Sequence, residues 1–162
     1  MLTGEQHDIR YRMPMQRVER NAVLAAPPGE VFAYLSNLET LAEWQTGITD
    51  ARITSEGETG VGSTALVTRE LMGQRIEAPL TVTEYEPPRH IAIGSEVSGV
   101  KVLATLDLAP TEDGRATDLA FSMEIRGSML TRFMEPMIAS AAGGDIEATL
   151  GRLEARFAAG PT

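Results

Sequence analysis

The alternation of apolar and polar residues begins at Met15 and predicts a strand over residues 15–26. Val18, Ala22 and Leu24 share one phase of this alternation, which is the period-two pattern of a half-buried strand. The preceding residues 1–14 are polar and irregular, and they are predicted to form an N-terminal arm. We therefore expect the arm to be followed by a single folded domain over residues 15–160.

Two short helices are predicted directly after the first strand. Pro28 suits a first helical turn, and Asn37 can end the helix that follows. Residues 38–44 can form the second helix. The first helix presents apolar residues at helical spacing, namely Val31, Phe32 and Leu35.

Residues 48–57 alternate as a further strand, and residues 62–88 are predicted to form a β-hairpin. Met72-Gly73 is its turn, with glycine supplying a positive φ. Counting outward from this turn places apolar residues on one face and polar residues on the other, which fixes the register. The predicted pairs are Leu71 with Gln74, Arg69 with Ile76, Val67 with Ala78 and Ala65 with Leu80.

Three more strands, over residues 90–96, 99–110 and 115–125, complete a meander. One face of the last two strands is consistently apolar, as in an antiparallel sheet with one solvated face. Such a face must be covered by another element. The sequence offers one element of sufficient length, a helix over residues 135–157.

This final helix contains Gly143-Gly144, although glycine inside a helix costs about 1 kcal/mol relative to alanine. One interpretation is that the helix seals its C-terminal half with large side chains and leaves space beneath the small residues Ala139 and Ala142. Another is that the glycines let the helix backbone approach the sheet closely. A third is a bend at Pro136 or at the glycine pair. The stripe predicted to pack on the sheet is Ile146, Leu150, Leu153 and Phe157.

Composition excludes several functions. The chain has no cysteine, so it has no disulfide, thiolate nucleophile or cysteine-ligated metal. Its formal net charge of −9 disfavours nucleic acid as a partner. No segment has the apolar length of a membrane span or the h-region of a signal peptide, so we expect a cytoplasmic protein. We find no spacing typical of metal ligands and expect no metal or organic cofactor.

The order of elements resembles the helix-grip fold of the START-like, or SRPBCC, superfamily, and several segments resemble its bacterial polyketide cyclase/dehydrase-like members. Residues 26–44, "APPGEVFAYLSNLETLAEW", are similar to the exit from the first strand and the two helices of that family. The segment "GQRIEAPLTVTEYEPPRHIAI" resembles its hairpin and Y-x-P-P strand end. The resemblance implies an α+β fold, in which a curved antiparallel sheet of about six or seven strands wraps around the C-terminal helix. It also implies a cavity for a hydrophobic or amphipathic small molecule.

Several residues are candidates to line that cavity. Trp44 follows the second short helix, where the resemblance places the cavity mouth, but it can equally anchor helix to sheet. Arg69 is the charged residue on the inward hairpin face, and a buried unpaired guanidinium is very costly. It either reaches water or meets an acidic or carbonyl group of a ligand. Tyr85 can offer its hydroxyl group or simply pack.

The remaining candidates are apolar. Val67, Phe121 and Met123 are inward on their strands and are core residues first, becoming cavity wall only if a cavity exists. Met137 and Ala141 belong to a second apolar stripe of the long helix, left for a ligand or for a second subunit.

His90 begins what we interpret as an edge-like strand and is expected to be solvated.

These residues support three hypotheses. The first is a carrier or sensor that binds a hydrophobic small molecule, favoured because no pair of residues presents itself for proton transfer. The second is a cofactor-free enzyme of the polyketide cyclase, aromatase or dehydrase type, with Arg69 and Tyr85 as polar contacts to its substrate. The third is an interaction module that forms a homodimer through its methionine stripe.

Overall fold

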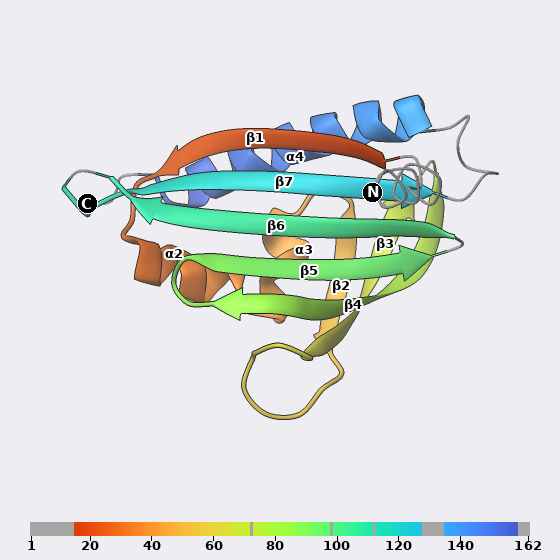
Figure 1. Cartoon of the computed structure of the whole chain (residues 1–162), viewed down its shortest axis with the longest axis horizontal. Coiled ribbons are helices and arrows are strands. Elements are labelled where there is room, and N and C mark those ends of the chain that lie inside the picture. Colours follow the sequence, from red (N-terminus) through yellow and green to blue (C-terminus); the bar gives the residue numbers. More distant parts are fainter. Residues whose placement is uncertain (1–14, 72, 98, 112, 128–134, 159–162) are drawn as a thin grey trace, which may run out of the picture.

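The computed structural model describes residues 15–71, 73–97, 99–111, 113–127 and 135–158 (Figure 1). The side chains at positions 15, 71 and 135–143 lie outside the described part. The predicted N-terminal arm, residues 1–14, also lies outside it.

The described strands form one antiparallel sheet of seven strands in the order β1-β7-β6-β5-β4-β3-β2. The first strand therefore lies at one edge, beside the last, and the rest of the sheet is a meander that ends at the opposite edge (Figure 1). The strands are β1 Met15–Leu24, β2 Ile48–Ile53, β3 Thr64–Leu71, β4 Gln74–Glu86, β5 His90–Val97, β6 Val100–Pro110 and β7 Thr117–Gly127.

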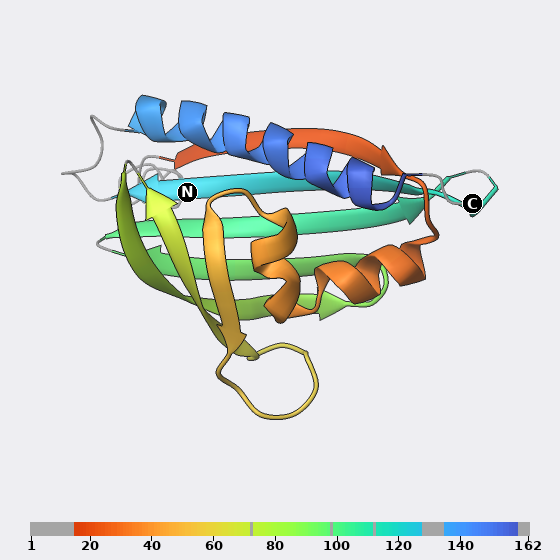
Figure 2. The same ribbon diagram turned by 180° about the vertical axis from the view of Figure 1, so that it is seen from behind.

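The helices lie where the sequence predicts them. After β1 come α2 Pro28–Leu35, the 3-10 turn η1 Leu38–Thr40 and α3 Leu41–Trp44, and the last described element is α4 Glu135–Arg156. Asn37 separates the first two elements because its side chain accepts a hydrogen bond from the backbone N–H of Glu39, which begins the new turn. Figure 2 shows α4 running along β1 and β7, with α2 and α3 over the other part of the same face.

The register of the hairpin between β3 and β4 is the one that the sequence predicts. Gly73 has φ of 81°, as the turn requires. All four predicted pairs, from Leu71↔Gln74 to Ala65↔Leu80, are present. The inward positions Val67 and Ala78 are buried, which confirms the predicted separation of the two faces.

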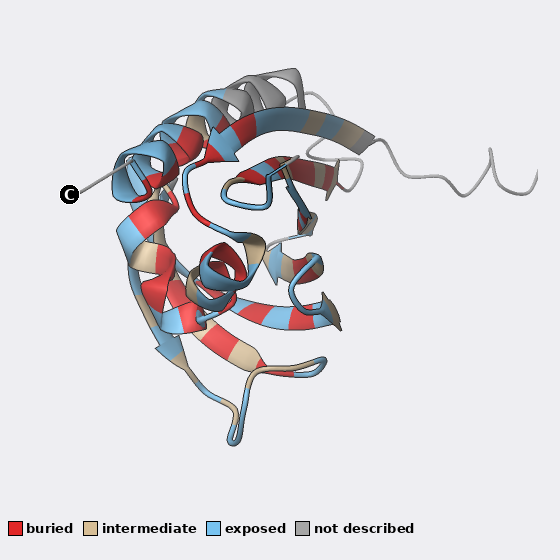
Figure 3. Cartoon of the chain, turned by 90° about the vertical axis from the view of Figure 1, so that its left-hand side faces the viewer, coloured by how far each residue is buried: buried red, intermediate tan, exposed pale blue. Residues whose placement is uncertain are grey.

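The core lies between the concave face of the sheet and the helices. Figure 3 shows the sheet curving around the helices, with buried residues alternating with exposed ones along its strands. Every second side chain of β7 points inward and contributes to this core. These are Leu119, Phe121, Met123 and Ile125, all buried.

The C-terminal half of α4 is anchored at several points. The predicted stripe of Ile146, Leu150, Leu153 and Phe157 is buried. The backbone N–H of Thr46 donates to Oγ1 of Thr149 at 3.0 Å, which ties the turn after α3 to the helix. The stripe therefore fixes this half of the helix against the sheet, as the spacing predicts.

The last turn of α4 also contacts α2. The Arg156 guanidinium lies 3.9 Å from the centroid of the Tyr34 ring, and the Phe157 ring meets Tyr34 edge-on. Tyr34 donates its hydroxyl hydrogen to Glu43 at 2.9 Å. Burial, followed by this hydrogen bond, raises the pKa of Tyr34 to about 12.

Gly143 and Gly144 lie inside a helix that runs without interruption from Glu135 to Arg156. Gly144 is exposed, and a Cβ atom placed on it would meet nothing within 4 Å. The interpretation that glycine lets the backbone approach the sheet is therefore wrong for Gly144. The space predicted beneath Ala139 and Ala142 lies outside the described side chains.

Candidate functional site

A small cavity lies between the concave face of the sheet and α3. Its volume is about 20 Å³, which is room for roughly one water molecule. Its walls come from α3 and its C-terminal end and from five neighbouring strands. The lining residues are Leu41, Trp44, Gln45, Arg69, Leu80, Ile93, Ser95, Val102, Ala104, Leu106 and Phe121.

Trp44 and Phe121 form the aromatic part of the wall. Their ring centroids are 6.3 Å apart in an edge-to-face arrangement, and both side chains are almost fully buried. The indole N–H of Trp44 donates to Oγ1 of Thr40 at 3.1 Å, so its polar atom is already satisfied within the protein. Trp44 therefore acts both as an anchor of α3 and as an apolar wall.

Arg69 brings the one cationic group among the residues that line this cavity. Burial lowers the pKa of its guanidinium, and the carboxylate of Asp145 on α4 partly offsets that effect. Burial in turn raises the pKa of Asp145, with Arg69 acting in the opposite direction. A mainly apolar lining with one guanidinium and the polar side chains of Gln45 and Ser95 is suited to a molecule that is mainly apolar and has a polar group.

The other predicted residues lie apart from this cavity. Val67 and Met123 are buried in the core but are not among its lining residues. Tyr85 on β4 packs against Phe32 of α2, with ring centroids 5.6 Å apart, and so it joins that helix to the sheet. The side chains of Met137 and Ala141 lie outside the described part.

Sequence reasoning missed Gln45 and Ser95 as cavity residues. Ser95 follows Ile93 at the period of two that marks the inward face of β5, so its position could have been found from the alternation. Gln45 terminates α3, and its placement depends on how that short helix meets the sheet. Asp145 directly precedes the first residue of the buried α4 stripe, but nothing in the sequence pairs it with β3.

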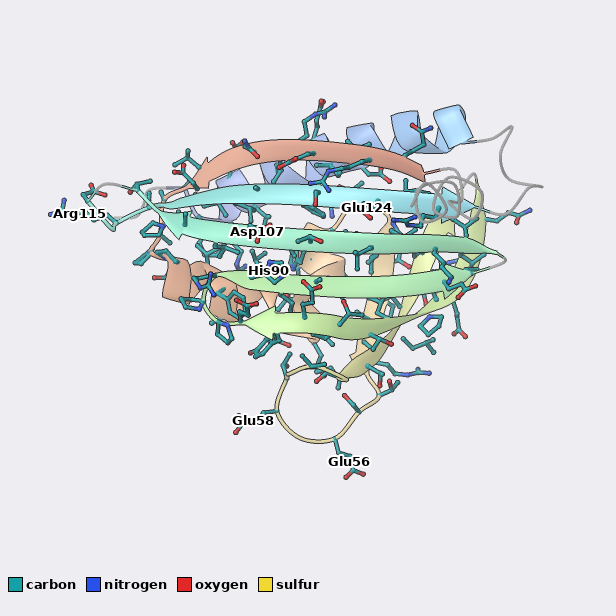
Figure 4. The ribbon with its side chains drawn as sticks, viewed as in Figure 1. Glu56, Glu58, His90, Asp107, Arg115 and Glu124 are labelled. Atoms are coloured by element: carbon teal, nitrogen blue, oxygen red, sulfur yellow. The ribbon has the colours of Figure 1, made fainter. Side chains whose placement is uncertain are left out.

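The prediction that His90 begins an edge-like strand is wrong, and its side chain is less solvated than predicted. Strand β5 lies between β4 and β6, and the His90 side chain is only 19% exposed. Its Nδ1 lies 2.6 Å from Asp107 and its Nε2 lies 2.6 Å from Glu84. Figure 4 shows His90 and Asp107 on adjacent strands. The hydrogen bond to Asp107, followed by that to Glu84, raises the pKa of His90.

Within the described ranges, no group of three or more His, Cys, Asp or Glu side chains is arranged to hold a metal ion. None of the helices there has the length and apolarity to cross a membrane.

Comparison with known sequences identifies a family. Residues 15–158 match the model of the family described as "Polyketide cyclase / dehydrase and lipid transport". The chain is also 30% identical over 137 residues to the uncharacterised protein Rv1546 of Mycobacterium tuberculosis, covering 84% of this chain and 94% of that protein.

Solved structures with the same fold are more distant in sequence. A START superfamily protein from Mycobacterium smegmatis superposes with a TM-score of 0.73 at 17% identity, over 87% of this chain and 96% of that one. The Zhui aromatase/cyclase from Streptomyces sp. R1128 superposes with a TM-score of 0.70 at 19% identity, over 92% and 100% of the two chains. The di-domain aromatase/cyclase BexL of the BE-7585A biosynthetic pathway gives 0.76 at 13% identity, over 99% of this chain and 55% of that one. The protein thus belongs to the polyketide cyclase/dehydrase and lipid transport family, and it shares its fold with a START superfamily protein.

Proposed function

We propose that this protein binds a hydrophobic or amphipathic small molecule between the concave face of its sheet and α4, as a carrier or sensor. The description of its family includes lipid transport, which supports this proposal. The apolar lining of the described cavity, with Trp44 and Phe121, is suited to such a ligand.

The volume for a ligand must extend beyond the described cavity. About 20 Å³ holds a water molecule and no metabolite. In this proposal, the remaining space lies beneath the first part of α4, where the sequence has small residues at Ala139 and Ala142.

Arg69 is the observation that carries the proposal. Arg69 is partly exposed, and the desolvation of part of its guanidinium has a cost that a hydrophobic residue of similar size would avoid. No stabilising ion pair within 4.0 Å links it to a carboxylate of the described residues. A polar group of a ligand at this position would satisfy its donors.

Native mass spectrometry of the freshly purified protein tests the proposal, because a bound molecule would appear as added mass. In parallel, the neutral polarity-sensitive dye N-phenyl-1-naphthylamine can be titrated into the protein. We expect the dye to bind the wild type with enhanced fluorescence. A ligand with a polar group, once recovered from the protein, should displace the dye from Arg69→Met less well than from the wild type. Arg75→Met, at an exposed position of β4, is the matched control. Absence of both added mass and dye binding would refute the proposal.

A second candidate is an enzyme of the aromatase or cyclase type. Two of the structural neighbours are aromatase/cyclases, and Arg69 lines the cavity here. Turnover distinguishes the two functions. If the purified protein changes the product distribution of a poly-β-ketone substrate and Arg69→Ala abolishes the change, the protein is an enzyme and the carrier assignment is wrong.

A further inference from the structure

A second charged group lies beside the guanidinium that lines the cavity. Nη2 of Arg69 and Oδ2 of Asp145 each lie 3.9 Å from the position that a Cβ atom would take on Gly47. The two atoms are therefore separated by at most twice that distance. These two described side chains nevertheless make no ion pair within 4.0 Å.

Arg69 supplies hydrogen-bond donors and Asp145 supplies hydrogen-bond acceptors. A guanidinium only donates, and an ionised carboxylate only accepts. A hydroxyl group placed between them can accept from Arg69 and donate to Asp145, so it satisfies both. A carbonyl oxygen satisfies only the first of them.

The charges of the pair also balance. A carboxylic acid ligand that reaches Arg69 would ionise and bring a second negative charge close to Asp145. In a partly buried setting, this repulsion is screened much less than at the surface. A neutral ligand meets no such repulsion.

We propose that Arg69 and Asp145 together make this protein selective for a neutral ligand that carries a hydroxyl group, over a carboxylic acid with the same carbon skeleton. The proposal rests on the proposed ligand-binding function. Asp145 is the determinant of specificity, because Arg69 alone would favour the acid.

Competition between 2-naphthol and 2-naphthoate for the N-phenyl-1-naphthylamine site, near neutral pH, tests this selectivity. We expect 2-naphthol to displace the dye from the wild type at the lower concentration. In Asp145→Asn, the ratio of the two dissociation constants should shift toward 2-naphthoate by about tenfold. Asp145→Ala provides a second variant of the same position, and far-UV circular dichroism verifies that each variant is folded.

Glu147→Gln is the matched control for charge. It removes one negative charge from the same helix, but Glu147 is exposed and pairs with Arg20 on the surface. We expect its ratio of dissociation constants to equal that of the wild type. An equal shift in Glu147→Gln, or no shift in the folded Asp145 variants, would overturn the selectivity while leaving ligand binding intact. Absence of both dye binding by the wild type and added mass in native mass spectrometry would instead refute the proposed function on which it rests.

Discussion

Replacing Gly144 by alanine should stabilise the protein. The position is inside α4, is exposed, and has nothing within 4 Å of a new Cβ atom. Gly151 in the same helix meets the same conditions. Alanine is favoured over glycine inside a helix by about 0.5–1 kcal/mol, largely because glycine loses more conformational freedom on folding. Each substitution should therefore raise the free energy of unfolding by that amount.

The two effects should add, because the residues share no contact partner and lie two helical turns apart. For a chain of this size, 1 kcal/mol corresponds to a rise in the melting temperature of about 2–4 °C. Urea unfolding followed by circular dichroism measures the free energy, and calorimetry measures the melting temperature. Single variants and the double variant give the test of additivity.

Gly62→Ala is the matched control. Its Cβ atom would also meet nothing within 4 Å, but its φ of 95° is a conformation that alanine adopts only with strain. The same chemical change should therefore destabilise the protein at this position. If Gly144→Ala lowers the free energy of unfolding while Gly151→Ala raises it, the backbone at Gly144 does not have the regular helical geometry on which this prediction depends. The glycine pair would then be needed for a bend in the helix.

Three further predictions concern other parts of the sheet and its cover. Asp107 and Glu84 raise the pKa of His90. The protonated His90 side chain therefore stabilises the protein fully below the ordinary histidine pKa of about 6.5, and this stabilisation is lost as pH rises through the raised pKa. Urea unfolding as a function of pH should show this decline in the wild type and not in His90→Gln. Leu153→Ala removes a fully buried side chain of α4 and should cost about 2–5 kcal/mol, measured by chemical denaturation. Thr117→Val deletes the donor of a buried 2.7 Å hydrogen bond to a backbone carbonyl and should cost about 1–3 kcal/mol by the same assay, whereas an unchanged midpoint would show that the bond adds nothing.

The regular elements could be predicted from the sequence because their signals are local. The β3–β4 hairpin is the clearest example, since Gly73 marks the turn and a period of two then determines every pair down to Ala65↔Leu80. Asn37 likewise marks the break between the two short helices through a hydrogen bond to a residue two positions away.

The polar contacts were harder to predict because they join residues far apart in the chain. His90 looks like a residue at the start of an edge strand until β6 is placed beside it and brings Asp107 to its ring. The proximity of Arg69 to Asp145 depends on how α4 lies across the sheet. The cavity volume depends on side-chain rotamers, which a pattern of apolar residues does not specify.

The pairing of the first strand with the last has a consequence for how the chain folds. Arg17 on β1 makes an ion pair with Glu124 on β7, a residue 107 positions later. Contacts between residues so far apart in the chain form slowly, because a long loop must close before they contribute any energy. During synthesis, β1 is made before the other described strands and lacks its partner until β7, Thr117–Gly127, has also been made. A nascent chain of this protein therefore exposes an unpaired strand edge while the five intervening strands are made, which is a state that chaperones recognise.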